Sequence, residues 1–404
     1  MDHGLEIWMH KLNSFKIAED GETATFGGGI QSGDVIQLLW AEGKQTGEPT
    51  VSFNVDRAND VVSGVCECTS YLGPGLGGGH GALQGRFGLL SDQFVSMHVA
   101  MADGEIHHIS ESEDSDLWWA MQGAGHNFGI VTSITSKIHD VPDNGLWGYE
   151  LLYFTGDLVE KLADLFNELA EYQPPDFLIW TYILHNPELD GENPVIMANF
   201  IQRNVTNIEC ELIDSFRDLS PDAPLVAQAG LYTDIPRWID TQRGGRGCAR
   251  DSFKVRFPIG FPRYNRDALR EFYDKFAEAT SGSSPFNTSM VLLEQYSTQG
   301  VKAIPEDSTA FPHRQDDLLL SPVITWTSTD EETENEAIAL GDTLREILHE
   351  KSGSEELHAY VNYAAGNEGP KNWYGYEPWR LEKLQELKRK YDPDAKFSYY
   401  APVP

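Results

Sequence analysis

The segment that most constrains this chain is a glycine-dense stretch over residues 64–81. Glycine loses more conformational entropy on folding than any other residue and fills no space in a core, so packing alone does not explain its abundance here. Such glycines let a backbone approach a flat or anionic ligand closely and offer N–H donors to it. A run of tight turns at a sheet edge accounts for the composition equally well. The glycines are Gly64, Gly73, Gly75, Gly77, Gly78, Gly79 and Gly81.

Two common phosphate-binding motifs do not match this stretch. A Walker A loop requires Gly-Lys-Ser/Thr after its glycines, and no such triplet follows. A dinucleotide fingerprint requires G-x-G-x-x-G after a strand and an acidic partner further on, and that pattern is absent as well. The stretch therefore predicts neither a P-loop nor a Rossmann nucleotide site.

The pattern of apolar residues separates an N-terminal part with short elements from a longer part with helices and strands. Before about residue 148 we expect a strand at 23–26, a helix at 35–40, a hairpin turning at 103–104, a helix at 115–119 and a strand at 130–138. Beyond it we expect helices at 158–172, 207–219, 266–280 and 331–351, and strands near 195–203, 290–297 and 321–328. Near the C-terminus a strand at 358–363 precedes a helix at 378–391. Strands separated by long helices predict an α+β fold with a sheet covered by helices.

Composition excludes two classes of partner. The 404 residues include 30 Lys and Arg against 63 Asp and Glu, which gives a formal net charge of −33. A chain this acidic repels phosphate backbones and anionic headgroups, so we expect no nucleic-acid and no membrane partner. The first residues show neither the basic nor the apolar stretch of a secretion signal, and the sequence predicts no particular location.

Several stretches together resemble one protein family. They are residues 66–81 (CECTSYLGPGLGGGHG), residues 116–132 (DLWWAMQGAGHNFGIVT) and residues 360–363 (YVNY), with shorter matches at 89–92, 102–105 and 390–393. In this order the chain resembles the FAD-linked oxidases of the berberine-bridge-enzyme-like group, above all its fungal secondary-metabolism members. The resemblance implies a two-part FAD-binding domain of the PCMH (vanillyl-alcohol-oxidase-like) type with an inserted α+β substrate domain. We therefore expect the FAD-binding domain over 1–148, the substrate domain over 149–355 and a C-terminal segment over 356–404 that returns to the flavin.

The resemblance also implies FAD as the cofactor. In many members a cysteine that lies eleven residues before the triple glycine is bonded to flavin C6, and counting back from Gly77 reaches Cys66. Cys68 is the alternative, and a small buried thiol without a cofactor role is a third interpretation. For His80 a catalytic role is one interpretation, and a turn histidine bonded to backbone is the other. The other expected flavin contacts are Gly73, Gly75, Gly77, Gly78, Gly79, His80, Gly81, Gly125, Asn127, Gly129, Ile130, Val131 and Asn362.

Tyr363 matches the second tyrosine of the family's Y-x-N-Y motif, which is the catalytic base in several members. A phenol with an ordinary pKa near 10 needs a cationic neighbour or an organised network to act as a base at neutral pH. Strand alternation would place Tyr363 on one face of its strand and Tyr360, the next candidate, on the other. Glu294 and Tyr296 alternate on a predicted strand; they face the substrate in one interpretation and form a solvated strand face in the other.

The function implied by the resemblance is that of an oxidase. FAD takes a hydride from a small organic metabolite whose proton leaves to Tyr363, and O2 reoxidises the flavin. The expected partners are a small-molecule substrate and O2, and the expected state is a monomer. The alternative is a flavin-free isomerase or cyclase, or an inactive protein that keeps the fold. Neither His-x-x-x-His nor paired Cys-x-x-Cys spacing occurs, so no metal site is predicted.

The sequence departs from the family pattern at two places. Family members carry a further N-terminal stretch with the pyrophosphate-binding loop and often a flavin-linking histidine, and the match here opens part-way through that subdomain. Residues 47–63 are an insertion in the flavin domain. Family members continue almost directly from a segment like residues 43–46 into one like residues 64–66. We therefore expect an N-terminally truncated gene model with a retained intron over 47–63. The same departure predicts weak FAD binding by this chain.

Overall fold

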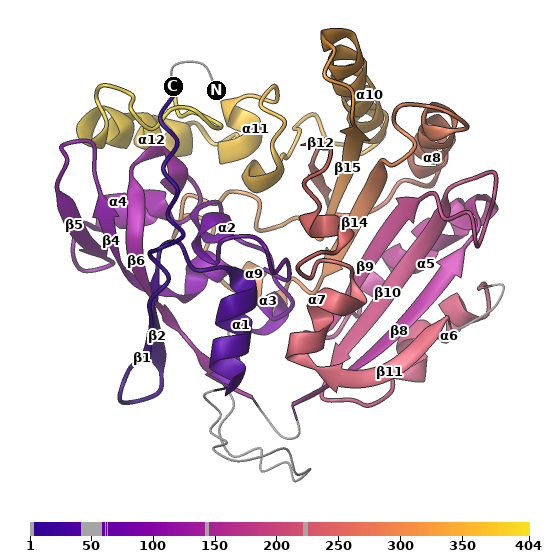
Figure 1. Ribbon diagram of the computed structural model, residues 1–404, viewed down its shortest axis with the longest axis horizontal. Coiled ribbons are helices and arrows are strands. Elements are labelled where there is room, and N and C mark those ends of the chain that lie inside the picture. Colours follow the sequence, from indigo (N-terminus) through magenta and orange to yellow (C-terminus); the bar gives the residue numbers. More distant parts are fainter. Residues whose placement is uncertain (1–3, 42–58, 61, 63, 142–144, 221–224) are drawn as a thin grey trace.

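The computed structural model describes residues 4–41, 59–60, 62, 64–141, 145–220 and 225–404. Its strands form two main antiparallel sheets that lie side by side (Figure 1). The predicted insertion over residues 47–63 lies outside the described residues, apart from strand β3 (Asn59–Asp60), which pairs with β7 (His139–Asp140), and Val62.

The smaller sheet has five strands in the order β1-β2-β6-β4-β5. The predicted hairpin through Asp103 and Gly104 is present, and so are the predicted first strand, the first helix and the strand at 130–138. The strands are β1 (Phe15–Ile17), β2 (Thr23–Gly27), β4 (Phe94–Ala100), β5 (Ile106–Ser110) and β6 (Ile130–Lys137). The helices beside them are α1 (Ser32–Ala41), α2 (Leu72–Leu76), α3 (Gln84–Phe87) and α4 (Ser115–Met121).

The larger sheet has eight strands in the order β11-β8-β10-β9-β14-β15-β12, with β13 also paired to β15. Helices α5, α6, α8 and α10 cover its far face in Figure 1. The strands are β8 (Leu146–Phe154), β9 (Phe177–Leu184), β10 (Val195–Arg203), β11 (Val226–Leu231), β12 (Phe253–Arg256), β13 (Ile259–Phe261), β14 (Met290–Tyr296) and β15 (Leu318–Trp326). The helices are α5 (Val159–Ala170), α6 (Cys210–Arg217), α7 (Ile235–Trp238), α8 (Arg266–Thr280), α9 (Gln299–Lys302) and α10 (Glu331–Glu350).

Both faces of the larger sheet are buried, each in a different core. Alternation along β8 sends Leu152 and Phe154 toward the covering helices, and Trp147 and Tyr149 into the core shared with the smaller sheet. On β14, Val291 and Leu293 belong to the helix side, whereas Leu292 and Tyr296 belong to the shared core. Side chains in register with Leu292 therefore face the smaller sheet.

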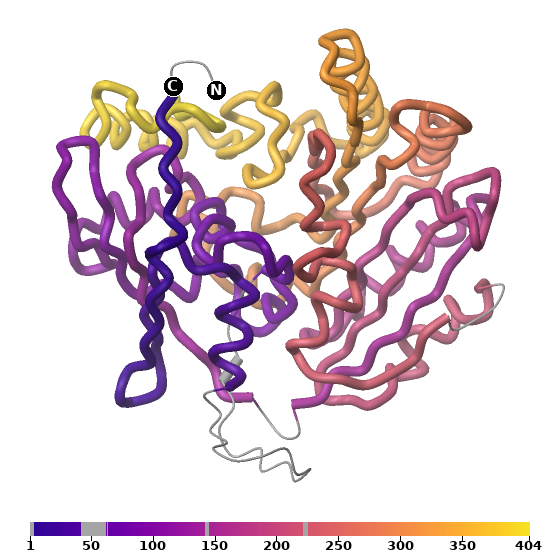
Figure 2. Tube along the Cα trace, viewed as in Figure 1, coloured from indigo at the N-terminus to yellow at the C-terminus, as the bar shows by residue number. Residues whose placement is uncertain are grey.

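The C-terminal segment runs back from the larger sheet to the smaller one, as the trace in Figure 2 shows. It contains α11 (Pro370–Tyr374) and α12 (Pro378–Tyr391), and α12 has the predicted bounds. The predicted strand at 358–363 is wrong. Only His358 pairs with a neighbour, Gly260, and Val361–Tyr363 form a 3-10 turn closed by the bond from Tyr363 N to Tyr360 O at 2.9 Å.

Among the residues that the structure describes, no helix is both apolar enough and long enough to span a lipid bilayer.

Candidate active site

A buried carboxylate with two tyrosine partners lies where the larger sheet meets the C-terminal segment. Glu294, on β14, is 1% exposed. Its Oε1 accepts a hydrogen bond from the Tyr363 hydroxyl at 2.8 Å, and its Oε2 accepts one from the Tyr296 hydroxyl at 3.0 Å. The solvated strand face considered from the sequence is therefore wrong, because both Glu294 and Tyr296 are buried.

Arg256, at the end of β12, supplies the positive charge of this cluster. Its guanidinium lies 4.2 Å from the centre of the Tyr363 ring, a cation–π arrangement. Its Nη1 is buried and has no hydrogen-bond partner within the described parts of the chain. Burial raises the pKa of Glu294, and the nearby Arg256 cation opposes that rise. Burial and the Glu294 charge raise the pKa of Tyr363 well above its ordinary value, so the resting phenol is neutral and donates to the carboxylate.

The 3-10 turn at Val361–Tyr363 brings Tyr360 and Tyr363 to the same site. Their ring centres are 5.1 Å apart, so the predicted placement on opposite strand faces is wrong. The Tyr360 hydroxyl accepts hydrogen bonds from Asn362 Nδ2 at 2.6 Å and from the backbone N–H of His80 at 3.4 Å. Asn362 Nδ2 also donates to the Pro74 carbonyl at 2.8 Å, which fixes the turn against the glycine stretch.

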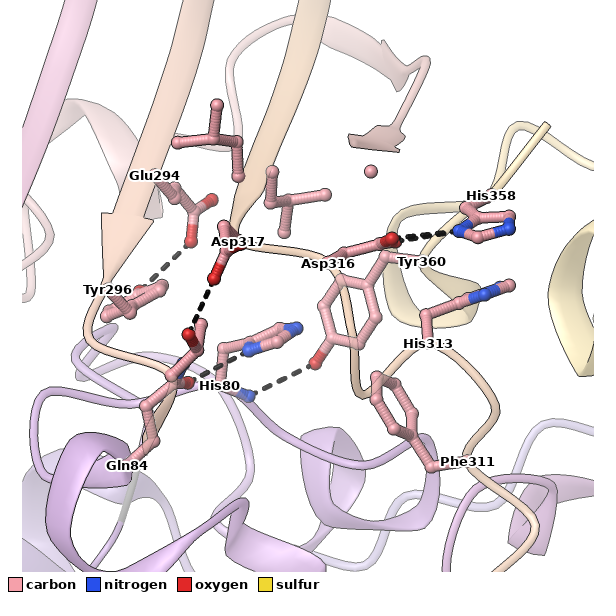
Figure 3. A pocket seen from close by; sticks show the side chains of 14 residues that line it. His80, Gln84, Glu294, Tyr296, Phe311, His313, Asp316, Asp317, His358 and Tyr360 are labelled. Carbon is pink, nitrogen blue, oxygen red and sulfur yellow. Dashed lines mark hydrogen bonds and ion pairs between the residues drawn. The ribbon is translucent and has the colours of Figure 1, made fainter. Parts of the chain in front are cut away.

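Hollows lie on both sides of this glutamate–tyrosine cluster. Glu294, Tyr296, Tyr360 and His80 line a narrow inner pocket that Figure 3 shows from close by. Tyr363, Arg256 and Asn362 line a cavity of about 320 Å³, the tyrosine cavity, together with Lys254, Met290 and Tyr400. The hydrogen bond between Tyr363 and Glu294 thus links the two hollows.

A third cavity, the glycine cavity, has a volume of about 450 Å³ and lies along the smaller sheet. Four of the predicted cofactor residues line it: Gly73, Gly129, Ile130 and Val131. Trp8, Leu72, Leu76 and Phe397 give it apolar walls, and Gly28 and Gly29 complete an edge of bare backbone. At Gly73 an added Cβ would meet nothing closer than 3.6 Å, so this glycine leaves room for a ligand.

Several of the other predicted cofactor glycines contact protein instead. A Cβ at Gly77 would lie 2.3 Å from Asn362 Oδ1, and one at Gly78 would lie 2.6 Å from the Phe311 ring. Gly75, Gly79 and Gly125 are equally tight against Phe94, Leu90 and Leu76. Packing therefore does explain much of the glycine content, contrary to the expectation from the sequence. Gly78 and Gly79 also need their positive φ of 102° and 87°.

The remaining predicted contacts have protein partners too. The side chain of Asn127 donates to Tyr374 Oη at 2.8 Å and accepts from the Val403 backbone N–H at 2.9 Å, so it fastens the C-terminal segment. His80 Nδ1 bonds Gln84 Oε1 at 2.9 Å, a side chain and not the predicted backbone group. The backbone N–H of Gly81 donates to the same Gln84 oxygen at 3.3 Å.

Two of the four cysteines form a disulfide, and the other two are free thiols. Cys68 is bonded to Cys248, which lies 180 residues away in the sequence. Cys66 is free, with its sulfur 3.5 Å from that of Cys68 and 3.8 Å from that of Cys248. Burial raises the pKa of the Cys66 thiol. Because Cys68 is engaged, Cys66 is the thiol of this pair that remains available to a ligand.

Sequence reasoning missed Arg256 and Cys248. Arg256 lies on a strand of only four residues, Phe253–Arg256, which carries no motif. The one signal was a positively charged residue in a run where apolar and polar residues alternate. A run of this length is rarely long enough to assign a strand. The partner of Cys68 could not be read from the sequence because disulfide connectivity depends on the fold.

His126, on the wall of the glycine cavity, gives a prediction for the dependence of stability on pH. Burial lowers its pKa to about 4; the Lys388 cation adds to this effect, and a hydrogen bond to the backbone of Ala401 opposes it. Between about pH 6.5 and 4 the unfolded chain binds a proton that the folded chain does not. The free energy of unfolding therefore decreases by roughly 2–3 kcal/mol as the pH falls through this range. His126→Gln should remove this part of the acid sensitivity, measured as urea midpoints from pH 7 to 4.5. The same substitution at exposed His107 is the control, and equal pH profiles for both variants would contradict the prediction.

The family profile "Berberine and berberine like" matches residues 359–404. A protein of Penicillium rubens named FAD-linked oxidoreductase chyH is 44% identical over 407 aligned residues, which cover 100% of this chain and 78% of the relative. The chain belongs to the berberine-bridge-enzyme-like family of FAD-linked oxidoreductases. FAD-linked oxidoreductase chry5 of Gibberella zeae is 41% identical over 100% of this chain and 77% of its own length. The protein is thus an FAD-dependent oxidoreductase, as the sequence motifs predicted.

Solved structures agree on the fold. Physcomitrella patens BBE-like 1 superposes with a TM-score of 0.79 at 19% identity, covering 98% of this chain and 81% of that one. A xylooligosaccharide oxidase from Myceliophthora thermophila, solved with xylobiose, gives 0.78 at 18% identity and covers 98% and 80%. The predicted α+β fold of the PCMH type is confirmed.

Proposed function

We propose that this berberine-bridge-enzyme-like protein oxidises a small organic metabolite at the glutamate–tyrosine cluster, in the secondary metabolism of a fungus. The observation that carries the proposal is the chain of Arg256, Tyr363 and Glu294, which combines a cation, a phenol and a buried carboxylate within hydrogen-bond or stacking distance. FAD, when bound, supplies the acceptor for a hydride that finally goes to O2.

The residues present fit a flavin. The glycine cavity offers apolar walls and open backbone at Gly73, which suits a flat ring system. The buried, unpartnered Nη1 of Arg256 suits an electron-rich group of the cofactor or substrate in the tyrosine cavity. Cys66 supplies a free thiol for a covalent bond. In this proposal Gly73, Gly129, Ile130, Val131 and Cys66 hold the cofactor.

The proton of the substrate leaves through Tyr363 to Glu294. The Tyr363 oxygen accepts the proton from the substrate while its own proton passes along the 2.8 Å hydrogen bond to Glu294 Oε1. The raised pKa of Glu294 makes the carboxylate a better acceptor than an exposed one, and Arg256 stabilises negative charge on the phenol during the transfer. Tyr360 and Asn362 hold the turn in place. The substrate proton thus ends on a buried group and not in solvent.

Hydrogen peroxide release under air tests the proposal. The purified protein is first saturated with FAD, and the flavin that it retains is read from the visible absorption. A panel of small hydroxylated compounds is then screened for peroxide release and for bleaching of the flavin under nitrogen. Turnover of a compound without flavin or O2 would instead establish the isomerase or cyclase, which the acid–base cluster could serve unaided. The expectation of weak FAD binding stays a prediction that the same spectrum decides.

Cys66 should carry any covalent flavin. Its position next to the Cys68–Cys248 disulfide leaves it as the free thiol of the glycine stretch, so Cys66→Ala should abolish flavin that survives acid precipitation. Peptide mass mapping should find the flavin adduct on the peptide that contains Cys66. Cys210→Ala, at the exposed free cysteine, is the matched control and should keep the adduct. Acid-stable flavin in Cys66→Ala would refute the assignment.

A further inference from the structure

Three side chains that play no part in the proposed reaction gather at the far end of the inner pocket. They are His313 and Asp316, in the loop before β15, and His358, just before the turn that carries the two tyrosines. The two imidazole rings stack with centroids 4.5 Å apart, and Asp316 lies beside His358 (Figure 3). One potential ligand atom of each residue lies within 4.8 Å of those of the other two.

The hydrogen bonds of His313 leave one of its ring nitrogens free to bind a cation. Its Nε2 lies 2.8 Å from the backbone oxygen of Asn372, which can only accept, so Nε2 carries the proton. Nδ1 of the neutral ring then holds an unshared electron pair. A histidine that donates one N–H to a backbone carbonyl and directs the other nitrogen at an ion is the usual arrangement in metal sites.

Asp316 is held close to His358 by a glycine. Its carboxylate lies 2.9 and 3.1 Å from His358 Nδ1. An added Cβ at Gly260 would lie 2.2 Å from Asp316 Oδ2, so a side chain at that position would displace the carboxylate. Gly260 also donates its N–H to the His358 carbonyl at 2.9 Å, which fixes the backbone of the histidine. The pair is therefore placed by the fold and not by chance contact of long surface side chains.

The surroundings favour a cation and give it a way in. A cavity of about 290 Å³ opens beside the three residues and is lined in addition by Glu306, Glu356 and Glu377. None of the described residues that line it is a lysine or an arginine. Arg380 approaches Glu377 to 3.4 Å and offsets part of the negative charge. Acidic side chains therefore outnumber basic ones around this cavity, and the two imidazoles lie at its inner end.

We propose that His313, Asp316 and His358 bind one divalent transition-metal ion of the Zn²⁺ class. Two imidazole nitrogens and a carboxylate oxygen form a ligand set that suits zinc, with water completing the coordination. The ion takes the place of the proton shared by His358 and Asp316. Ligand atoms about 2.0–2.2 Å from one tetrahedral ion are about 3.4 Å apart, so binding requires the 2.9 Å contact to open and the wider separations, up to 4.8 Å, to close. One of the two stacked rings, whose planes differ by 21°, must also rotate so that both nitrogens point at the ion.

The bound ion links the loop before β15 to the segment that carries the proposed base. His358 precedes Tyr360 by two residues and Tyr363 by five. Leu357, next to His358, donates its N–H to Tyr376 Oη at 3.0 Å, and Tyr376 bonds Asn372 Oδ1 at 2.7 Å. The carbonyl partner of His313 and the backbone beside His358 are thus tied together. We assign the ion a structural role, and its binding is independent of flavin and substrate.

Calorimetric titration of the full chain with Zn²⁺, after removal of metals by chelation, tests the proposal. We expect one equivalent to bind, and Asp316→Asn and His358→Gln each to weaken the affinity at least about tenfold. Both substitutions keep a hydrogen-bonding side chain at the site, and circular dichroism verifies the fold. His107→Gln, at an exposed histidine paired with Asp103, is the matched control and should bind as the parent does. Failure to bind one equivalent, or unchanged affinity in both site variants, would overturn the proposal.

Zinc-edge X-ray absorption on the unmodified protein provides a readout that needs no variant. Nitrogen and oxygen neighbours alone, at about 2.0–2.2 Å, support the histidine site. A sulfur neighbour at about 2.3 Å would mean that a free thiol, Cys66 or Cys210, holds the ion, and the assignment would then be wrong.

Discussion

Replacing Tyr363 by phenylalanine is expected to slow substrate-dependent flavin reduction by at least about a hundredfold, the usual scale for loss of a general base. The change removes the hydroxyl that donates to Glu294 and keeps the ring beneath Arg256. Flavin content should stay close to that of the parent protein, because the 3-10 turn is held by Asn362 and by backbone bonds. Anaerobic rapid mixing with a compound that the parent oxidises, at matched flavin absorbance, measures the rate.

Two further variants separate the role of the hydroxyl from that of its surroundings. Glu294→Gln keeps a hydrogen-bond acceptor for Tyr363 but takes up no proton, so it should slow the same step. Tyr296→Phe removes only the other partner of the carboxylate and should have a smaller effect. Full activity in Tyr363→Phe would remove the tyrosine from the mechanism, and Tyr360, 5.1 Å away, would be the next residue to test.

The sequence predicted the elements whose apolar pattern is amphipathic. Helices α5, α8, α10 and α12 have one face in a core and one in solvent, and their predicted bounds agree with the observed ones to within about two residues. Strands β10 and β15 of the larger sheet were predicted although nearly all of their residues are buried, whereas β8 and β9 of the same sheet were missed. A strand that is apolar on both faces shows no alternation and cannot be told from a buried helix by periodicity.

The site was predicted in its residue types more than in its geometry. Glu294 and Tyr363 were named as candidates from the sequence, and the structure brings them together. The hydrogen bond between them joins β14 to the C-terminal turn, and no spacing rule relates positions 69 residues apart. The turn at Val361–Tyr363 was mistaken for a strand because a run of apolar and aromatic residues favours extended structure. Tertiary hydrogen bonds, such as that from Asn362 to the Pro74 carbonyl, stabilise the turn instead of a strand. His313 and His358 were not singled out for the same reason, since they approach each other only in the fold.

Residues 89–92 belong to a stretch that the resemblance singled out, and the structure shows that Asp92 is an anchor between distant segments. Asp92 forms a two-point ion pair with Arg314, with oxygen–nitrogen distances of 2.7 and 3.0 Å. The side chains are 3% and 0% exposed. Asp92 also accepts the N–H of Leu89 at 2.8 Å. The pair joins the turn before β4 to the loop that carries His313.

Asp92→Asn should lower the free energy of unfolding by about 3–5 kcal/mol, because it leaves the Arg314 cation buried without a counter-charge. Asparagine keeps the size of the side chain and an oxygen for Leu89, so the lost charge is the main change. Urea denaturation measures the loss, with Glu171→Gln as control, since the Glu171–Arg263 pair is exposed and its loss should cost about 0–1 kcal/mol. The double variant Asp92→Leu/Arg314→Met should recover part of the stability, because removing both charges also removes the cost of burying either one. A loss below about 1 kcal/mol for Asp92→Asn would show that water reaches Arg314 and that the pair does not anchor the loop.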